Sequence, residues 1–160
     1  MYERIVLAYD GSLEGRTALR EGALLAKRCR SKVFLLSVAV ETTGTRLAKG
    51  IDAGPFMERE ESYKAVLADG VERMRKFGFE PVARLVSGDP AKVIGQFATE
   101  VSADLVVVGY RRQSALERWW LGPSGAYLVD QIRCSLLVSR KVIGDADFEA
   151  ELLKAAQSTP

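Results

Sequence analysis

The sequence predicts an α/β fold in which a parallel sheet lies between two layers of helices. Short apolar runs without polar alternation are typical of strands that are covered on both faces, as parallel strands are. These runs alternate with segments whose apolar residues recur at helical spacing. This alternation indicates parallel strands joined by right-handed crossovers, hence a three-layer sandwich. The 160 residues suit a single domain.

Five apolar runs are the expected strands. They lie at residues 5–9, 33–40, 81–87, 105–108 and 135–139. Arg84 interrupts the third run with a charge, which indicates an edge position or one solvated face. In folds of this kind ligands bind outside the carboxyl ends of the strands, where the strand order reverses. We therefore expect a site at Asp10-Gly11-Ser12 after the first strand and from Gly109 onward after the fourth.

Residues with known capping preferences mark the helices between these strands. Ser12 is a good N-cap for the helix that follows the first strand. A long helix opens at Pro55 and ends before Gly78, a natural residue to follow a helix. Its apolar residues recur at helical spacing, and Tyr63 falls on that apolar face. Asp89-Pro90 combines a carboxylate cap with proline at the first helical position.

Three further segments complete the expected chain. Glu41–Pro55 contains three glycines and little periodicity, which favours a loop. Gly122 leads into another helical segment before the last strand. Asp147–Gln157 is expected to form a short amphipathic helix in a C-terminal tail.

Composition excludes several mechanisms. The chain has no histidine, so a Ser-His-Asp or Cys-His nucleophile, a His-ligated zinc site and a histidine pH switch are all ruled out. The net charge of +2 gives no reason to expect nucleic-acid binding. Cys29 and Cys134 lack metal-ligand spacing and are expected to be small buried thiols. The absence of a signal peptide and of a membrane-length apolar run favours a cytoplasmic protein without a membrane partner.

Two stretches carry candidate binding chemistry. The Asp10 carboxylate could accept hydrogen bonds from ribose hydroxyls or an amino group, or it could organise only its own turn. Gly122 to Ser124 precede a helix and could form an anion nest, or they could be plain turn and cap residues. Arg111 and Arg112 are possible phosphate partners, although adjacent loop arginines are more often solvated. Neither a P-loop nor a strand-linked GxGxxG is present.

Several stretches together resemble the universal stress protein family. They are residues 5–12, 88–90, 103–109, 121–129 and 134–138, in the order and at the separations typical of that family. The resemblance covers residues 1–140 and leaves 141–160 outside as a C-terminal tail with a short helix. It implies the adenine nucleotide alpha hydrolase-like fold, with strand order 3-2-1-4-5. It also implies a homodimer paired through the last strand, Ser135–Ser139, and such strand addition fits an exposed edge.

The resemblance also implies a nucleotide site and identifies two departures from it. Members that bind ATP carry Gly-x2-Gly-x9-Gly-[Ser/Thr] after the fourth strand. Here Gly109 and Gly122 match the first and third glycines, but Arg112 replaces the second and Pro123 replaces the hydroxyl residue. Arg112 obstructs close backbone approach, and Pro123 removes a hydroxyl and a backbone N–H group. The phosphate half of the site is therefore expected to be damaged.

The nucleoside half of that site is retained. By the same resemblance, Asp10 matches the aspartate on the ribose or adenine side, and Val38 matches the backbone contact of the second strand to the base. Ser124 and the nearby arginines could compensate partly on the phosphate side.

Two functional hypotheses follow. The first is a dimeric regulatory or interaction module of the stress response, with possible protein partners and without efficient ATP binding or meaningful turnover. The alternative is an ATP- or AMP-binding protein whose occupancy switches the 41–55 loop, with at most slow hydrolysis. In that alternative, Gly109, Gly122 and Ser124 hold the phosphates and magnesium neutralises them. An enzyme on the same scaffold is a weaker third hypothesis, and no catalytic residue is assigned.

Overall fold

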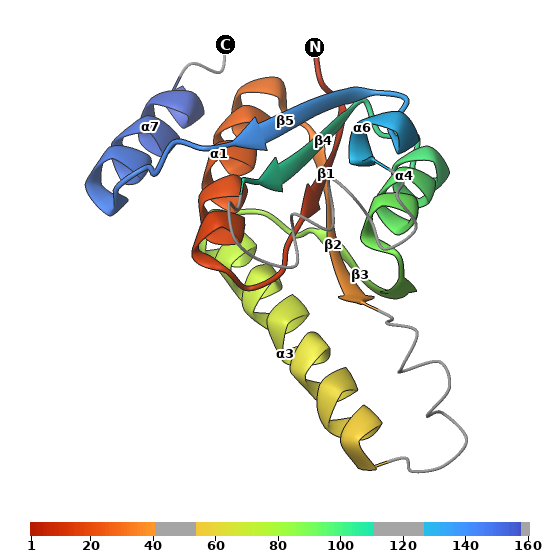
Figure 1. Ribbon diagram of the computed structural model, residues 1–160. Helices are drawn as coiled ribbons and strands as arrows, with labels where there is room; N and C mark the ends of the chain where they lie inside the picture. Colours follow the sequence, from red (N-terminus) through yellow and green to blue (C-terminus); the bar gives the residue numbers. More distant parts are fainter. Residues whose placement is uncertain (41–53, 111–126, 158–160) are drawn as a thin grey trace.

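A computed structural model describes residues 1–40, 54–110 and 127–157, with side chains described from residue 59 onward in the second range. Its centre is a five-stranded, all-parallel sheet of order β3-β2-β1-β4-β5, which confirms the expected topology (Figure 1). The strands are β1 (Arg4–Ala8), β2 (Lys32–Val40), β3 (Val82–Gly88), β4 (Leu105–Gly109) and β5 (Ser135–Ser139). All five expected strands are present, with ends shifted by at most one residue.

Helices cover both faces of the sheet (Figure 1). They are α1 (Leu13–Cys29), α3 (Gly54–Lys76), α4 (Pro90–Glu100), α6 (Leu128–Gln131) and α7 (Asp145–Gln157). One core cluster joins α1, α3 and α7 to the side chains of Ile5, Leu7, Leu35 and Val107. A second cluster joins α4 and α6 to the alternate strand residues. The three layers of the expected sandwich are therefore present.

The predicted helix boundaries agree with the caps. The hydroxyl oxygen of Ser12 accepts a hydrogen bond from the Gly15 N–H (2.9 Å). Asp89 caps α4 by accepting from the Lys92 N–H (3.2 Å), and Pro90 is the first helical residue. Gly78 has a φ of +84°, a conformation that suits glycine after a helix.

The C-terminal helix is longer than expected and packs on the domain. The expected helix began at Asp147, whereas α7 begins at Asp145 and lies against α1. Phe148 is 3% exposed and contacts Phe77 after α3, with ring centroids 4.5 Å apart. Ion pairs between α1 and the α7 side hold the same contact. The segment after residue 140 therefore contributes to the core of the domain.

The two edges of the sheet differ in character. β3 is an edge strand, as Arg84 indicated, and this arginine pairs with Glu100 and lies over the Phe97 ring. β5, the other edge, has three partly buried apolar residues at its centre and carries no charged side chain. Charge on one edge discourages strand addition there, whereas nothing in the sequence of β5 does.

Two smaller expectations have different outcomes. Cys29 and Cys134 are only partly buried, so the expectation of buried thiols was wrong in degree. Cys29 is the last residue of α1, and Cys134 directly precedes β5. Burial still raises the pKa of the Cys134 thiol, with a further contribution from Asp104. Within the ranges that the structure describes, no helix is long and apolar enough to cross a membrane.

Candidate functional site

The candidate site lies where the crossovers change face. α1 and α3, which connect β1 to β2 and β2 to β3, pack on one face of the sheet, whereas α4 and α6 pack on the other. The reversal falls between β1 and β4, neighbours in the sheet that are far apart in the chain. In open parallel sheets this reversal opens a crevice at the carboxyl ends of the strands. β1, β2 and β4 end at this crevice.

Asp10 organises the turn that follows β1. Its Oδ1 accepts hydrogen bonds from the N–H (3.0 Å) and the hydroxyl (2.5 Å) of Ser12. Gly11 adopts a φ of +80°, which allows the chain to turn between them. A side chain at Gly15 would come within 2.6 Å of the same carboxylate oxygen. Asp10 therefore organises its own turn, which is one of the two roles that the sequence left open. Any contact with a ligand would be additional to this role.

Val38 offers backbone groups to the crevice. Its side chain is 4% exposed and belongs to the core, so only its N–H and C=O are candidates for a ligand. The Tyr9 N–H donates to the Leu36 carbonyl (2.9 Å), so Leu36 directs its carbonyl toward β1. Backbone groups of alternate residues in a strand point to the same edge, and Val38 therefore also faces that way. The pairing of β2 with β1 ends at Leu36 and Ala8. Val38 is therefore two residues past the last residue of β2 that pairs with β1.

A second contact ties β2 to the chain entering the Asp10 turn. The buried Ser37 hydroxyl donates to the Tyr9 carbonyl (2.8 Å). Tyr9 directly precedes Asp10, so this bond fixes the aspartate relative to the end of β2. The structure thus brings together the two residues expected to hold a nucleoside.

Gly109 has a packing role at the end of β4. A Cβ added there would lie 2.5 Å from the Glu14 carbonyl oxygen and 3.0 Å from the Gly15 nitrogen. Both atoms belong to the first turn of α1, so the missing side chain allows this helix to begin directly against β4. The remaining expected site residues, Arg112, Gly122 and Ser124, lie outside the described residues, as do residues 41–53 of the loop expected at 41–55.

A polar network on α3 was not predicted from the sequence. The buried Tyr9 hydroxyl donates to Asp69, which also accepts from Arg73 Nε (2.8 Å). Burial raises the pKa of Tyr9, and Asp69 raises it further. The hydrogen bond from Arg73 lowers the pKa of the Asp69 carboxyl. The helical spacing of α3 indicated its apolar face, but no sequence signal paired Asp69 with a tyrosine sixty residues away.

Tyr63, also on α3, reaches the end of β2. Its hydroxyl oxygen accepts a hydrogen bond from the Val40 N–H (3.3 Å). The sequence indicated only that Tyr63 lies on the apolar face of the helix. With Val66 and Gly70 it forms a face that follows the crevice, because these residues are spaced three and four apart.

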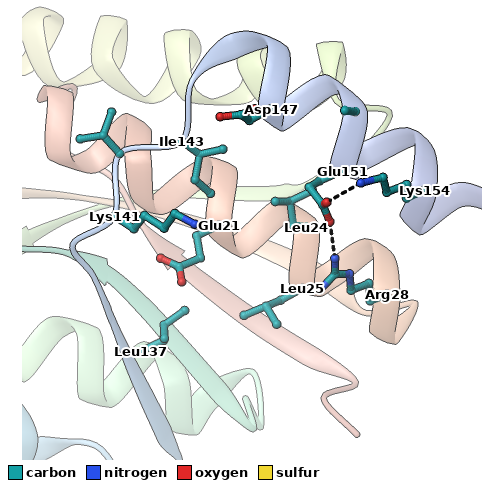
Figure 2. A pocket seen from close by; sticks show the side chains of 12 residues that line it. Glu21, Leu24, Leu25, Arg28, Leu137, Lys141, Ile143, Asp147, Glu151 and Lys154 are labelled. Atoms are coloured by element: carbon teal, nitrogen blue, oxygen red, sulfur yellow. Dashed lines mark hydrogen bonds and ion pairs between the residues drawn. The ribbon is translucent and has the colours of Figure 1, made fainter.

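A cavity also lies away from the strand ends. It has a volume of about 560 Å³ between α1, β5 and α7, and its floor includes Leu25, Leu137 and Ile143. Figure 2 shows Glu151 at one end of it, bonded to both Arg28 (2.6 Å) and Lys154 (3.0 Å). These charges satisfy one another across α1 and α7. The chemistry expected from the sequence belongs to the crevice at the strand ends, and we assign the site there.

The described part of the chain offers no metal centre: no three His, Cys, Asp or Glu side chains group there in a way that could hold a metal ion. For an adenine nucleotide, the donor set at the crevice fits the nucleoside portion, with a carboxylate beside a strand end that has backbone donors and acceptors. Magnesium would therefore have to be held largely by the phosphates of a bound nucleotide.

Comparisons with known proteins identify the family. The Universal stress protein family model matches residues 1–140. A universal stress protein of Staphylococcus aureus (strain USA300) is 28% identical over 94% of this chain and 92% of its own length. The structure is similar to that of a family member from Burkholderia pseudomallei (27% identity, TM-score 0.64, covering 86% of this chain and 95% of that one).

A third relative was solved with a ligand. The universal stress protein of Archaeoglobus fulgidus in complex with dAMP is 24% identical, with a TM-score of 0.63, over 87% of this chain and 98% of its own. At this identity the likeness concerns the fold, which is the adenine nucleotide alpha hydrolase-like fold. The family match, the strand order and the crevice agree, and this chain belongs to the universal stress protein family.

Proposed function

We propose that this protein is a regulatory module of the stress response that binds an adenine nucleoside monophosphate and does not bind ATP efficiently. The observation that carries the proposal is that β2 continues to Val40, whereas its pairing with β1 ends at Leu36. This continuation directs the backbone N–H and C=O of Val38 into the crevice beside Asp10. A strand end with one donor and one acceptor suits the edge of a purine, and a neighbouring carboxylate suits ribose hydroxyls.

The sequence supports a single phosphate rather than three. Arg112 stands where ATP-binding relatives have glycine, and Pro123 stands where they have a hydroxyl residue. These changes remove close backbone approach and one N–H donor from the phosphate side. A monophosphate depends on that side less than a triphosphate does, and the relative from Archaeoglobus fulgidus was solved with a monophosphate, dAMP.

Titration calorimetry with AMP and with ATP-Mg²⁺ tests this proposal. We expect AMP to bind and ATP-Mg²⁺ to bind no more tightly. Asp10→Asn should weaken AMP binding, because it removes the charge while retaining an acceptor for the Ser12 turn. Asp89→Asn is the matched control, since Asp89 also caps a helix but lies at the start of α4. Wild-type protein that binds neither nucleotide would contradict the proposal.

The double variant Arg112→Gly with Pro123→Ser tests the phosphate side. We expect it to bind ATP-Mg²⁺ more tightly than the wild type while its affinity for AMP changes little. An unchanged affinity for ATP would mean that these two positions are not what limits triphosphate binding. Tight binding of ATP by the wild type would restore the alternative hypothesis of an ATP-dependent switch.

A homodimer through β5 is the second part of the proposal. The Tyr110 N–H donates to the Ser139 carbonyl (2.9 Å) and the Ser135 N–H to the Asp104 carbonyl (3.2 Å), so the odd-numbered residues of β5 face β4. The N–H groups of Leu136 and Val138 therefore point to the open edge, available to a second copy.

Sedimentation distinguishes a dimer paired through β5 from a monomer. The wild type should sediment at twice 17.6 kDa. Val138→Pro removes an outward N–H without breaking the pairing to β4, and it should produce a monomer. Val138→Ala, which keeps the N–H, should remain dimeric. A monomeric wild type at high concentration would contradict this interface.

A further inference from the structure

The end of β2 is contacted by an aromatic side chain that no part of the proposed function uses. Tyr63 is half-buried on α3, and its hydroxyl oxygen accepts the Val40 N–H at 3.3 Å. This is a contact between a helix side chain and the last residue of a strand, at the carboxyl end of the sheet.

The edge of β2 that Tyr63 contacts is the one that faces the crevice. Leu36 accepts from β1, and residues 38 and 40 follow with the same orientation. The Tyr63 hydroxyl therefore occupies the N–H of Val40, and the next backbone groups along this edge are those of Val38. This contact places the Tyr63 hydroxyl two residues along the same edge from Val38.

Two more residues of α3 continue the same wall. A Cβ built at Gly11 would lie 3.2 Å from Val66 Cγ2, so Val66 packs beside the Asp10 turn. A Cβ built at Gly70 would lie 2.7 Å from Tyr9 Cδ1, so this glycine packs against the residue before Asp10. One face of α3 thus extends from the end of β2 to the end of β1, with Tyr63 as its aromatic member.

We propose that Tyr63 is a specificity-determining residue of the nucleoside site, with its ring packed against the purine base. The inference rests on the proposed function, because it concerns the ligand of the same crevice. An aromatic ring selects for a planar base through stacking and leaves the phosphates untouched. The Tyr63 hydroxyl has a separate task, which is to hold the strand end through Val40.

Calorimetry with adenosine and AMP tests the ring. Tyr63→Leu keeps apolar bulk in α3 and should weaken both ligands by the same factor, about 10-fold, the loss typical of a removed base-stacking ring. Tyr63→Phe keeps the ring and should change either affinity by no more than about 3-fold, the scale of one modest hydrogen bond. Tyr2→Leu is the matched control, since Tyr2 packs at the opposite end of β1, and it should leave both affinities unchanged.

Amide exchange tests the hydroxyl without any nucleotide. Tyr63→Phe should accelerate exchange of the Val40 amide, which loses its acceptor, and leave the Tyr9 amide, bonded to Leu36, unchanged. An unchanged Val40 amide would overturn the contact on which the inference rests.

The outcomes separate this inference from the proposed function. A wild type that binds adenosine, with Tyr63→Leu binding equally well, overturns the role of Tyr63 alone. A loss confined to AMP would place Tyr63 at the phosphate and overturn it as well. A wild type that binds neither adenosine nor AMP overturns the proposed function and this inference with it.

Discussion

α3 and α7 pack on the same face of the sheet but contribute in different ways. Two polar side chains of α3 reach the candidate site: Tyr63 contacts Val40, and Asp69 contacts Tyr9 beside Asp10. The polar contacts of α7 stay at the surface on α1, while Phe148 fills the core. The difference teaches that one helix shapes the crevice whereas the other stabilises the domain. Changes on α7 should therefore affect the free energy of unfolding, and changes on α3 should also affect ligand affinity.

The largest effect is expected at the buried aromatic of α7. Phe148→Ala removes a nearly fully buried ring that packs on Phe77, and it should lower the free energy of unfolding by about 3 kcal/mol. Urea unfolding measures this loss, and Phe148→Leu should recover most of it. AMP affinity, measured below the transition, should not change. A weakened affinity would show that α7 also shapes the crevice and would break the comparison.

A steric clash on α3 should cause the next largest loss in the free energy of unfolding. Gly70→Ala places a methyl group 2.7 Å from Tyr9 Cδ1 and 2.9 Å from Leu35 Cδ2, and overpacking of this kind costs about 1–3 kcal/mol. Because the Tyr9 ring is buried and its hydroxyl is bonded, the strain should also weaken AMP binding. Gly144→Ala, where an added Cβ meets only Asp147 Oδ2 at 3.8 Å, is the control. Equal behaviour of the two variants would argue against a crowded contact at Gly70.

Removing the hydroxyl of Tyr9 should lower the free energy of unfolding by less than crowding its ring does. Tyr9→Phe removes the donor to Asp69, and the loss of one such bond to a charged group costs about 1–2 kcal/mol. Thermal unfolding measures the cost, and AMP titration measures any displacement of Asp10. Asp69→Asn, which retains an acceptor, should be milder than Tyr9→Phe. The reverse order would locate the stabilisation in Arg73 rather than in Tyr9.

The same network has a defined pH dependence. Since Arg73 lowers the pKa of Asp69, the folded state binds its proton less readily than the unfolded chain does. The stabilisation by Asp69 is therefore complete above the unfolded pKa of about 4 and is lost as the pH falls through the lower folded pKa. Unfolding of wild type and Asp69→Asn across pH 3 to 7 should give stabilities that differ most near neutral pH. A difference that grows toward low pH would contradict this sign.

The smallest effect is expected at the surface of α7. Arg28→Ala removes the ion pair with Glu151, whose carboxylate retains Lys154. Exposed pairs contribute little and are screened by salt, so the unfolding midpoint should move less than in any variant above. Repeating the measurement in high salt should remove the remaining difference. A shift as large as that of Phe148→Ala would mean that the ion pairs, rather than the ring, hold α7.

Local signals in the sequence predicted most of the fold. Ser12, Asp89-Pro90 and Gly78 mark helix ends through contacts within a few residues, so their roles can be recognised without tertiary structure. The apolar runs predicted the five strands for the same reason, and Arg84 marked β3 as the partly exposed one. The packing of α7 on the domain could not be predicted, because it depends on contacts between residues far apart in the chain, such as Phe148 with Phe77.

The candidate site was predicted in part. Asp10 follows from its place at the end of the first strand, and Val38 from the resemblance to the family; the contacts of Ser37 and Leu36 with Tyr9 tie the end of β2 to the chain that enters the Asp10 turn. The sequence indicated only that Tyr63 lies on an apolar helix face. Its hydrogen bond with Val40 depends on how α3 packs on the sheet, which the sequence does not show. A tyrosine has an apolar ring and a polar hydroxyl; helical spacing can predict the packing of the ring but not the partner of the hydroxyl.

The crowding around Gly109 has a consequence for how related chains are interpreted. The first turn of α1 leaves no room for a Cβ at this position, with or without a nucleotide nearby. A descendant that abandoned phosphate binding altogether would still need glycine at 109, as a requirement of helix placement. Gly109 therefore carries little information about ligands. Under the function proposed above, positions 112 and 123 are the ones whose residues would differ between chains that bind a triphosphate and chains that do not.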